Sequence, residues 1–514
     1  MTVVGKDSYK RRKIVQRSEK RCRKNMMRMV SMVFPVTIVV ILGEVCRLTF
    51  YYLDDKGIAL AVMLTTYLLL LTAYVTICFL YQFQRRQNDL LKLAYCDPLT
   101  GAYNYSRFKK ECEELLKNEH SYSIVTLDME KFRMINVRFG KKKADQILCE
   151  ISNILKQDIK ENECYCREAA DHFFLLLKED VGNRVKEILR KIEMLSDLLD
   201  KEFYIQTRAG IIDCKKEKSV VIYDRAIDSV VFALKEAKKE NKKILYYDDA
   251  LKEKERIQNY IELYKEKALF RGEIQVFLQP KVDLKTGKIA GAEALVRWIK
   301  EDGDMIYPDQ FIPIFEQNGF DVQLDLYVCD RIGKKIREWC DRGISPISIS
   351  VNQSKRLFNR PDYIEQLSEI LERYQIPSSS IILEMTEGTE IRDVEAINQV
   401  IEKLHEKGFR VSMDDFGSGY SSLNVLGSVM LDELKFDRMF LLGLRRENNL
   451  RQKAIMRSIV SFAKEMNMTV VVEGVETPEH EEFIKNLGCE YGQGYYYSKP
   501  IPINEFEEKY LVSK

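Results

Sequence analysis

The feature that most constrains the fold is a series of eight apolar runs in the C-terminal half of the chain, each ending in polar side chains. The runs read QVFLQPK, IAGAEALVRW, PISISVN, SIILEMTE, FRVSMDD, DELKFD, TVVVEG and YGQGYYY. Continuous apolar runs are typical of strands that a parallel sheet buries on both faces. Helical stretches lie between most of the runs, at 324–342, 360–374, 393–407, 449–466 and 477–487. This α/β alternation over 250–514 predicts a (β/α)8 barrel of the TIM type.

The polar groups at the ends of these runs predict one shared site. In a barrel of parallel strands the C-terminal ends meet at a single rim, and that rim carries the chemistry. Any one of these groups alone is read as a solvated acid or a strand-end cap, but several buried carboxylates at one rim repel one another unless cations neutralise them. The groups are Gln279, Glu293, Asn352, Glu384, Glu387, Asp414, Asp415, Lys435, Asp437, Glu473 and Gln493.

The composition narrows the kind of cation. Only four histidines occur, at positions 120, 172, 405 and 480, and none of them ends a run, so the ligands are expected to be oxygens. Oxygen ligands favour hard ions, and we therefore expect Mg²⁺ or Mn²⁺. The adjacent acids Asp414 and Asp415 suit two bridged ions, which stabilise the attacking and leaving oxygens of a displacement at phosphorus. The rim thus predicts phosphodiester hydrolysis.

The ordered motifs of this region resemble those of the EAL-domain cyclic di-GMP phosphodiesterases. The resemblance covers about residues 255–510 and includes the tripeptide Glu293-Ala294-Leu295 that names the family. It implies a (β/α)8 barrel that hydrolyses cyclic di-GMP to linear pGpG with two Mg²⁺ or Mn²⁺ ions. The remaining motifs are SVNQS from Ser350, EMTE from Glu384, DDFGSGYSSL from Asp414, KFD from Lys435, EGVE from Glu473 and QGY from Gln493, with Pro500 after them.

The same resemblance implies roles for the metal ligands and the catalytic groups. Lys435 is expected to hold the attacking water or a phosphate oxygen as charge builds at phosphorus. Glu473 is expected to be either a ligand of the second metal or the general base, and the sequence does not choose between the two. The expected metal ligands are Glu293, Asn352, Glu384 and Asp414 for the first ion, with Asp414 and Asp415 for the second.

The resemblance also implies substrate contacts around these groups. Arg297 suits a phosphate because its planar guanidinium makes paired hydrogen bonds. Glu387 is counted with the catalytic residues. Together with Glu476 it is expected to orient the loop after Asp415, where Gly417 and Gly419 give the backbone freedom to respond to substrate. The expected substrate-binding residues are Gln279, Leu295, Arg297, Asp437, Gln493 and Pro500.

Two interpretations of the barrel differ in whether it turns its ligand over. An active phosphodiesterase needs every metal ligand, and none is missing from the rim. The alternative is a non-catalytic receptor module that binds cyclic di-GMP or GTP, a class that usually shows a lost ligand. One departure from the family is Lys281, which follows Gln-Pro where an aliphatic residue is usual. At a strand end its side chain is expected to face solvent or to contact a phosphate.

Residues 97–249 show a second alternation of strands and helices, which predicts an α/β sandwich. This stretch resembles the GGDEF diguanylate cyclase family. The resemblance implies that Asp128, at a strand end, can meet a metal and that Asn136 and Asp145 can hold a guanine. The other matching features are D-x-L-T-G at Asp97–Gly101, Phe132, and Arg167 before the signature.

The signature of that family is altered in this chain. Where the family has Gly-Gly-Asp/Glu-Glu-Phe, the chain has Ala169-Ala170-Asp171-His172-Phe173. The two glycines form a tight turn that Cβ atoms strain, and a neutral His172 is a poor ligand for Mg²⁺. Val137 and Lys141 also replace the family's Asp and His. We therefore expect a degenerate domain without cyclase activity, which either binds GTP as a regulatory ligand or has only a structural or dimerising role.

The N-terminal region predicts a membrane hairpin. Residues 1–28 are rich in Lys and Arg, whereas Met29–Gly43 and Gly57–Gln84 carry no charge. Each apolar stretch, with its flanks, can cross a hydrocarbon core about 30 Å thick. Basic residues precede the first span and follow the second, so the positive-inside rule places both ends in the cytoplasm. We expect a basic cytoplasmic segment (1–28), two transmembrane helices (29–84) and a linker helix (85–96), in a multi-pass protein of the inner membrane with both domains in the cytoplasm.

Charge, cysteine usage and the family resemblance set the expected partners. A formal net charge of +2 gives no global basic field, so a nucleic-acid polymer is not expected. Twelve cysteines without a paired framework are typical of reduced thiols in the cytosol. The expected partners are cyclic di-GMP as substrate, GTP at the domain over 97–249, the membrane, and a second copy in a homodimer, which the resemblance implies.

Overall fold

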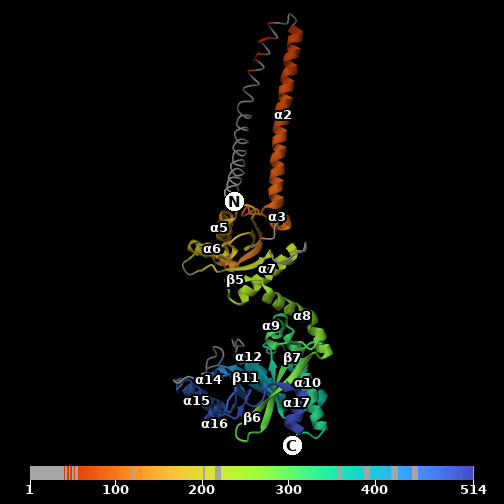
Figure 1. The fold of residues 1–514 in the computed structure, drawn as a ribbon, viewed down its shortest axis with the longest axis vertical. Helices are drawn as coiled ribbons and strands as arrows, with labels where there is room; N and C mark the ends of the chain where they lie inside the picture. The colour runs from red at the N-terminus through yellow and green to blue at the C-terminus, as the bar shows by residue number, and fades with distance from the viewer. Residues whose placement is uncertain are drawn as a thin grey trace. The chain divides into compact units, whose positions relative to one another are not determined.

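The computed structural model divides the chain into two compact units, Met1–Glu255 and Arg256–Lys514. Figure 1 shows the elements of each unit. Glu387 and Gly419 lie outside the described residues, and so does nearly all of the first expected span, Met29–Gly43. The structure describes residues 40, 43–44, 47–48, 51, 56–118, 121–200, 203–214, 222–356, 360, 362–386, 394–417, 426–442 and 450–512.

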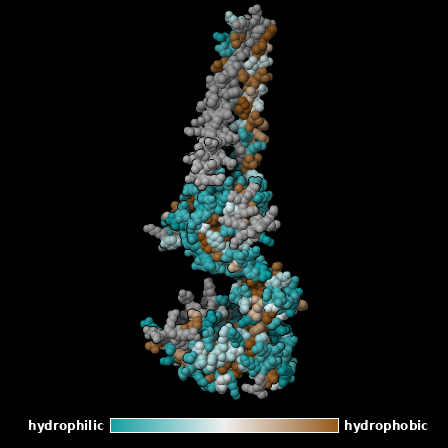
Figure 2. Space-filling model, viewed as in Figure 1, coloured by the Kyte–Doolittle hydropathy of each residue, from teal (hydrophilic) through white to brown (hydrophobic). Residues whose placement is uncertain are grey.

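The second apolar stretch belongs to one long helix, α2 (Lys56–Tyr95), which also contains most of the expected linker helix. Among the described residues it is the one helix long and apolar enough to cross a membrane, over Leu60–Tyr95, and its most apolar stretch is not buried in the structure. Figure 2 shows hydrophobic side chains along it. Threonine hydroxyls donate to backbone carbonyls three or four residues earlier, which satisfies these polar groups without water. The donors are Thr65, Thr66, Thr72 and Thr76.

The first unit also contains a five-stranded sheet in the order β2-β3-β1-β4-β5. Its strands are β1 (Ser123–Met129), β2 (Cys164–Ala169), β3 (His172–Leu177), β4 (Thr207–Asp213) and β5 (Ile244–Tyr246). The helices are α3 (Tyr105–Asn118), α4 (Phe132–Phe139), α5 (Lys141–Asp158), α6 (Val181–Glu193) and α7 (Ile222–Lys239), with a 3-10 turn, η1 (Met194–Leu198).

Two apolar cores lie on the two faces of this sheet. Successive residues of a strand face opposite sides, so Val125 of β1 packs with α4, α5 and α6, whereas Ile124 packs with α3 and α7. The predicted α/β sandwich is therefore confirmed.

The second unit begins within the charged helix α8 (Asp249–Arg271) and contains a ten-stranded sheet. Eight of the strands close into a barrel, because β6 pairs with both β7 and β14. They are β6 (Ile274–Asp283), β7 (Ile289–Ile299), β9 (Ser348–Gln353), β10 (Ile381–Thr386), β11 (Arg410–Phe416), β12 (Glu433–Phe436), β13 (Thr469–Val472) and β14 (Tyr491–Gly492). The short strands β8 (Met305–Ile306) and β15 (Ile501–Pro502) pair with β7 and β6. Each predicted apolar run thus contains a barrel strand.

Helices follow most of these strands, and one apolar core joins them to the barrel. That core contains Trp298 and Trp339, which are the only tryptophans of the chain. The helices are α9 (Pro308–Asn318), α10 (Asp321–Asp341), α11 (Tyr363–Tyr374), α12 (Val394–Glu406), α14 (Met439–Leu442), α15 (Leu450–Glu465), α16 (Pro478–Leu487) and α17 (Ile503–Glu507), with short helical turns η4 (Ser378–Ser380) and η6 (Glu508–Val512).

The direction of β6 corrects the predicted barrel. The other neighbouring barrel strands are parallel, whereas β6 runs antiparallel to both β7 and β14. The turn over 284–288 that joins β6 to β7 is too short for a helical crossover, and strands joined in this way must be antiparallel. Gln279 pairs with Glu293 and so still reaches the rim. The residues after Gln279, however, run away from the rim and into the barrel.

Candidate active site

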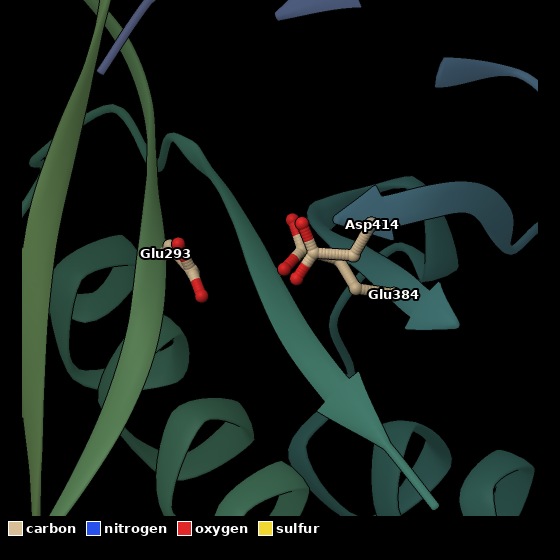
Figure 3. Close-up of side chains that lie close together, drawn as sticks. All are labelled: Glu293, Glu384 and Asp414. Carbon is tan, nitrogen blue, oxygen red and sulfur yellow. The ribbon is translucent and has the colours of Figure 1, made fainter. Parts of the chain in front are cut away.

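The C-terminal ends of the parallel strands bring the predicted carboxylates together. Glu293 lies on β7, Glu384 on β10 and Asp414 on β11, and each offers an oxygen within 4.8 Å of the others. Figure 3 shows these three side chains, with the carboxylates of Glu384 and Asp414 side by side. All three residues are buried. A second group, formed by Asp414, Asp415 and Glu473, lies within the same distance.

Asp414 and Asp415 both reach the site because β11 is irregular at its end. A regular strand points successive side chains to opposite faces. The pairing of β11 with β12 shifts register between Met413 and Phe416, and Asp415 has a φ of 55°. This left-handed conformation is uncommon for residues other than glycine and costs backbone strain, which persists mainly where function requires it.

Lys435 lies at the centre of these carboxylates. Its side chain is fully buried, and its ammonium nitrogen lies 2.7 Å from Glu473, 2.9 Å from Glu384, 2.9 Å from Asp414 and 3.4 Å from Glu293. Burial lowers the pKa of Lys435, but the surrounding carboxylates outweigh it and raise the pKa well above its usual value. Lys435 is therefore a fixed cation within the site.

Lys435 alone does not neutralise the carboxylates of the two groups, which are Glu293, Glu384, Asp414, Asp415 and Glu473. Burial raises the pKa of Glu293, and burial raises the pKa of Glu473 to about 8. Burial and then the charge of Asp414 raise the pKa of Asp415. Burial also acts on Glu384, but the neighbouring lysines hold the pKa of Glu384 at about 2. Burial and neighbouring negative charge thus disfavour the ionised forms of Glu293, Asp415 and Glu473, and a bound cation would favour them.

This donor set fits a pair of divalent cations. Glu293, Glu384 and Asp414 would hold one ion, with the amide oxygen of Asn352, whose Nδ2 donates to Glu293 Oε1 at 3.0 Å. The group of Asp414, Asp415 and Glu473 would hold the second. Carboxylate and amide oxygens suit Mg²⁺ and Mn²⁺.

A pocket of about 540 Å³ lies over these groups, a size that suits a small-molecule ligand. Of the expected substrate residues, Gln279, Leu295, Arg297 and Gln493 line it. Gln493 Nε2 donates to Glu293 Oε2 at 2.5 Å and to Gln279 Oε1 at 3.1 Å. Gln279 Nε2 in turn donates to the carbonyl of Ser498 at 3.1 Å. A chain of amides therefore links the wall of the pocket to the carboxylates.

Two expected substrate residues are not among the described residues that line this pocket. Asp437 accepts a hydrogen bond from the Met439 amide at 2.8 Å, at the start of α14. Pro500 directly precedes β15, where Ile501 pairs with Leu278 of β6. Asp437 directly precedes Arg438, which lines the pocket, whereas Pro500 lies five residues after Tyr495, the last residue of the lining.

Four residues of this region have positions that the sequence did not predict. Arg438 lines the pocket, and Gly474 leaves it room, because a Cβ at Gly474 would lie 2.3 Å from Arg438 Cβ. Glu433 is buried inside the barrel. The expectation that Lys281 faces solvent or a phosphate is wrong, because antiparallel β6 carries it into the barrel, where its side chain is 4% exposed.

Asp325 of α10 is a buried acid in the wall of the same pocket. Its Oδ2 accepts a hydrogen bond from the Ser354 amide at 2.7 Å. Burial raises the pKa of Asp325 to about 7, although the hydrogen bond from Ser354 lowers it. In the unfolded chain an aspartate titrates near pH ~4. Between about pH 4 and pH 7 the unfolded chain therefore loses a proton that the folded chain keeps, so stability falls as pH rises through this range.

Asp325→Asn is expected to remove this loss, because the amide oxygen can still accept the Ser354 hydrogen bond. At pH 8 the variant should melt about 4 °C above the unaltered protein, and at pH 4.5 the difference should shrink towards zero. Fluorescence of Trp298 and Trp339 reports the melting of this unit alone. An equal shift at both pH values would contradict the assignment.

In the first unit the altered signature forms the turn between β2 and β3. Ala170 has a φ of 47°, the region that glycine favours, so a strained residue stands where the family has glycine. His172 is held on both sides, by Thr126 Oγ1 at 2.8 Å and by Glu168 Oε2 at 2.9 Å. Both ring nitrogens thus have protein partners.

The other groups that the resemblance assigns to a metal or a guanine are divided between an ion pair and a separate pocket. Asp128 pairs with Lys238, whose Nζ lies 2.8 Å from its Oδ2. Asn136, Asp145 and Asp171 line a pocket of about 430 Å³. The arrangement leaves space for a ligand next to the predicted guanine contacts.

Comparison with known proteins gives the same division of the chain. Residues 94–243 match the family described as diguanylate cyclase, GGDEF domain, and residues 265–500 match the EAL domain family. One match lies in each structural unit. The first includes the altered signature, and the second includes the carboxylate rim.

Several curated proteins have both parts. The chain is 27% identical over 434 residues to the bifunctional diguanylate cyclase/cyclic di-GMP phosphodiesterase MucR of Pseudomonas aeruginosa, covering 82% of this chain and 62% of that protein. It is 25% identical over 436 residues to the cyclic di-GMP phosphodiesterase PdeR of Escherichia coli, covering 83% of this chain and 65% of that protein. The cyclic di-GMP phosphodiesterase NbdA of Pseudomonas aeruginosa is 27% identical over 438 residues, covering 84% of this chain and 55% of that protein. The chain thus spans between about half and two thirds of the length of these relatives.

Two solved structures are among those that the chain matches. The structure described as "PaMucR Phosphodiesterase, c-di-GMP complex" is 35% identical and covers 48% of this chain and 99% of that chain, with a TM-score of 0.45. "Vibrio cholerae LapD S helix-GGDEF-EAL (bound to c-di-GMP)" is 19% identical and covers 81% of this chain and 99% of that chain, with a TM-score of 0.49. The chain therefore belongs to the family of proteins that join a GGDEF domain to an EAL domain.

Proposed function

We propose that the EAL unit hydrolyses cyclic di-GMP to linear pGpG. The observation that carries this proposal is the convergence of five carboxylates at one pocket. Glu293, Asp414, Asp415 and Glu473 line the pocket, and Glu384 is buried behind it, within 4.8 Å of Glu293 and Asp414. Relatives that share both units are described as cyclic di-GMP phosphodiesterases, and one solved EAL structure is described as a cyclic di-GMP complex.

The chain's own residues suit this reaction. Two bound divalent cations would supply the charge that an in-line attack of water at phosphorus requires. Lys435 places a buried positive charge beside Glu473, Asp414 and Glu384, where negative charge builds during the attack. Arg297 at the pocket wall offers a guanidinium for a phosphate oxygen. Glu473 lies next to Asp414 and Asp415, and its proposed role is either to ligate the second ion or to take the proton of the water.

The test uses the full chain, solubilised in a mild detergent and freed of metal. Cyclic di-GMP is added with Mg²⁺ or Mn²⁺, and the products are separated by chromatography. We expect linear pGpG with either ion and none in EDTA. Tight binding of cyclic di-GMP in Mg²⁺ without a linear product would favour the receptor module instead.

Calcium is expected to inhibit this reaction. Ca²⁺ takes oxygen ligands at about 2.3–2.6 Å in flexible geometry, whereas Mg²⁺ requires about 2.0–2.1 Å and an octahedral arrangement. Ca²⁺ should therefore occupy the carboxylates without supporting the displacement. The measurement is the hydrolysis rate in Mg²⁺ with increasing Ca²⁺, and with Ca²⁺ as the only divalent ion. A full rate in Ca²⁺ alone would count against the two-ion site.

For the GGDEF unit we propose a regulatory role in which GTP binds without being converted. The pocket lined by Asn136 and Asp145 supports binding, whereas Ala170 and His172 replace groups that the cyclase reaction needs. The full chain with GTP and Mg²⁺ should form no cyclic di-GMP, and GTP should change the rate of pGpG formation. Substituting Asp145 with alanine should remove that response, and a response that survives the substitution would place GTP elsewhere.

We also propose that the chain is anchored in the inner membrane with both units in the cytoplasm, and that it acts as a homodimer. The apolar stretch of α2 supports the anchor. Extraction of membranes at alkaline pH should leave the protein in the membrane fraction, and light scattering of the detergent-solubilised chain should give the mass of two copies.

A further inference from the structure

A second lysine lies inside the barrel, below the carboxylates. Lys281 of β6 is 4% exposed, and its ammonium group has three neighbours. The distances from its nitrogen are 2.6 Å to Ser350 Oγ, 2.8 Å to Glu433 Oε1 and 3.1 Å to Glu384 Oε1. A lysine ammonium has three hydrogens to donate. Every one of them therefore has an acceptor, so the group is fixed in place.

The partner that holds Lys281 from the other side is Glu433 of β12. Glu433 is buried, and its Oε1 also accepts a hydrogen bond from Ser412 Oγ at 3.1 Å. Side chains two residues apart on a strand share a face. On three parallel strands a polar residue lies two positions before the rim residue: Ser350 before Asn352, Ser412 before Asp414, and Glu433 before Lys435. On antiparallel β6 the corresponding residue is Lys281, two positions after Gln279. They form a polar layer directly beneath the rim.

This layer contacts the site through Glu384. The two oxygens of Glu384 are divided between the two lysines, with Oε1 on Lys281 and Oε2 on Lys435 at 2.9 Å. Lys435 also contacts Glu293, Asp414 and Glu473, so Oε2 is the oxygen that faces the other carboxylates. With Oε1 held from below, rotation of the Glu384 carboxylate is blocked.

We propose that Lys281, held by Glu433, is a positioning residue that fixes the carboxylate of Glu384 with Oε2 directed at the cation site. This inference rests on the proposed function in that it takes Glu384 to be a metal ligand. Partners that orient a metal ligand through hydrogen bonds typically change metal affinity or activity about 10–100-fold when they are removed. Stability alone does not account for the pair, because buried ion pairs often contribute no more than neutral side chains of the same volume.

The experiment replaces the pair with neutral side chains of similar shape in the full chain, as Lys281→Met with Glu433→Gln. Net charge is unchanged, and the glutamine oxygen can still accept from Ser412. Mn²⁺ affinity is measured by electron paramagnetic resonance, alongside kcat and KM for cyclic di-GMP. The matched control is Lys300→Met with Asp304→Asn, which removes a lysine–aspartate pair, 2.9 Å apart, that lies away from the site.

We expect the Kd for Mn²⁺ to rise about tenfold or more and kcat to fall by a similar factor, with KM and the tryptophan fluorescence unchanged. The control should match the unaltered protein in all four measurements. A Kd for Mn²⁺ that stays the same or decreases would overturn the proposal, as would an unaltered chain that binds no Mn²⁺. An unaltered chain that binds Mn²⁺ without hydrolysing cyclic di-GMP would defeat the proposed function, while the comparison of Kd values would still decide the role of Lys281.

If the double variant does not fold, Ser412→Ala decides in its place. That substitution removes the hydrogen bond that Ser412 Oγ donates to Glu433 Oε1 without altering charge, so Glu433 no longer holds Lys281 in one position. A smaller rise in the Kd for Mn²⁺ is expected, and an unchanged Kd would overturn the proposal.

Discussion

Glu293→Gln is expected to lower kcat for cyclic di-GMP at least about a thousandfold while the barrel stays folded. The loss corresponds to several kcal/mol of charge stabilisation by a bound cation, at about 1.36 kcal/mol for each factor of ten. Glu293 receives hydrogen bonds from Asn352 Nδ2 and Gln493 Nε2, and glutamine keeps the shape but not the negative charge. Asp414→Asn should have the same effect, because both groups of carboxylates include Asp414.

The matched control for these variants is Glu301→Gln. Glu301 lies just after the same strand as Glu293, but its side chain is exposed and pairs with Arg271 at 2.8 Å. Its turnover should equal that of the unaltered chain. Rates are measured by pGpG formation, and tryptophan fluorescence checks that each variant is folded. Near-normal turnover by Glu293→Gln would show that the metal assignment is wrong.

Lys435→Met is expected to abolish turnover and also to destabilise the metal-free EAL unit by about 3–5 kcal/mol, the usual effect of leaving buried charges without their partner. Four carboxylates lie within 3.4 Å of Lys435 Nζ, and each loses a cation. Mn²⁺ should recover part of the stability, since an ion that binds only the folded state stabilises it. Urea unfolding followed by tryptophan fluorescence, in EDTA and in Mn²⁺, measures both effects.

Lys300→Met serves as the comparison for this loss. Lys300 contacts Asp302 and Asp304, whose side chains are exposed, and exposed ion pairs contribute about 0–1 kcal/mol. Its variant should unfold at the same urea concentration as the unaltered chain, with or without Mn²⁺. A Lys435→Met protein as stable in EDTA as the unaltered chain would mean that the carboxylates are not charged together.

The sequence located the strands well because apolar runs report burial. Every run from QVFLQPK to YGQGYYY contains a barrel strand, and each expected helix from 324–342 onward has its counterpart. Burial carries no information on strand direction, and for that reason β6 was expected to be parallel. A signal was nevertheless present. Asp283 accepts hydrogen bonds from the amides of Lys285 and Thr286, and Gly287 has a φ of 69°, the chemistry of a tight turn between two adjacent strands.

The limits of the site prediction have three separate causes. Reading each run to its end selects the last polar residues of each strand, and it passes over polar residues one full period earlier. Glu433, two residues before Lys435, belongs to that unread layer. The position of Lys281 near the end of its run predicts that it faces solvent or contacts a phosphate, whereas the antiparallel direction of β6 makes it interior. Arg438 and the conformation of Asp415 depend on loop geometry, which residue patterns do not determine.

The pairing of the antiparallel strand β6 also determines where this chain can be shortened. Since β6 pairs with β7 on one side and with β14 on the other, the last barrel strand is held by the first. A product that stops before Tyr491 would lose β14 and leave both β6 and β13 with unpaired edges. Open edges of this kind recruit other strands. C-terminal truncation is thus expected to yield aggregates rather than a smaller soluble barrel.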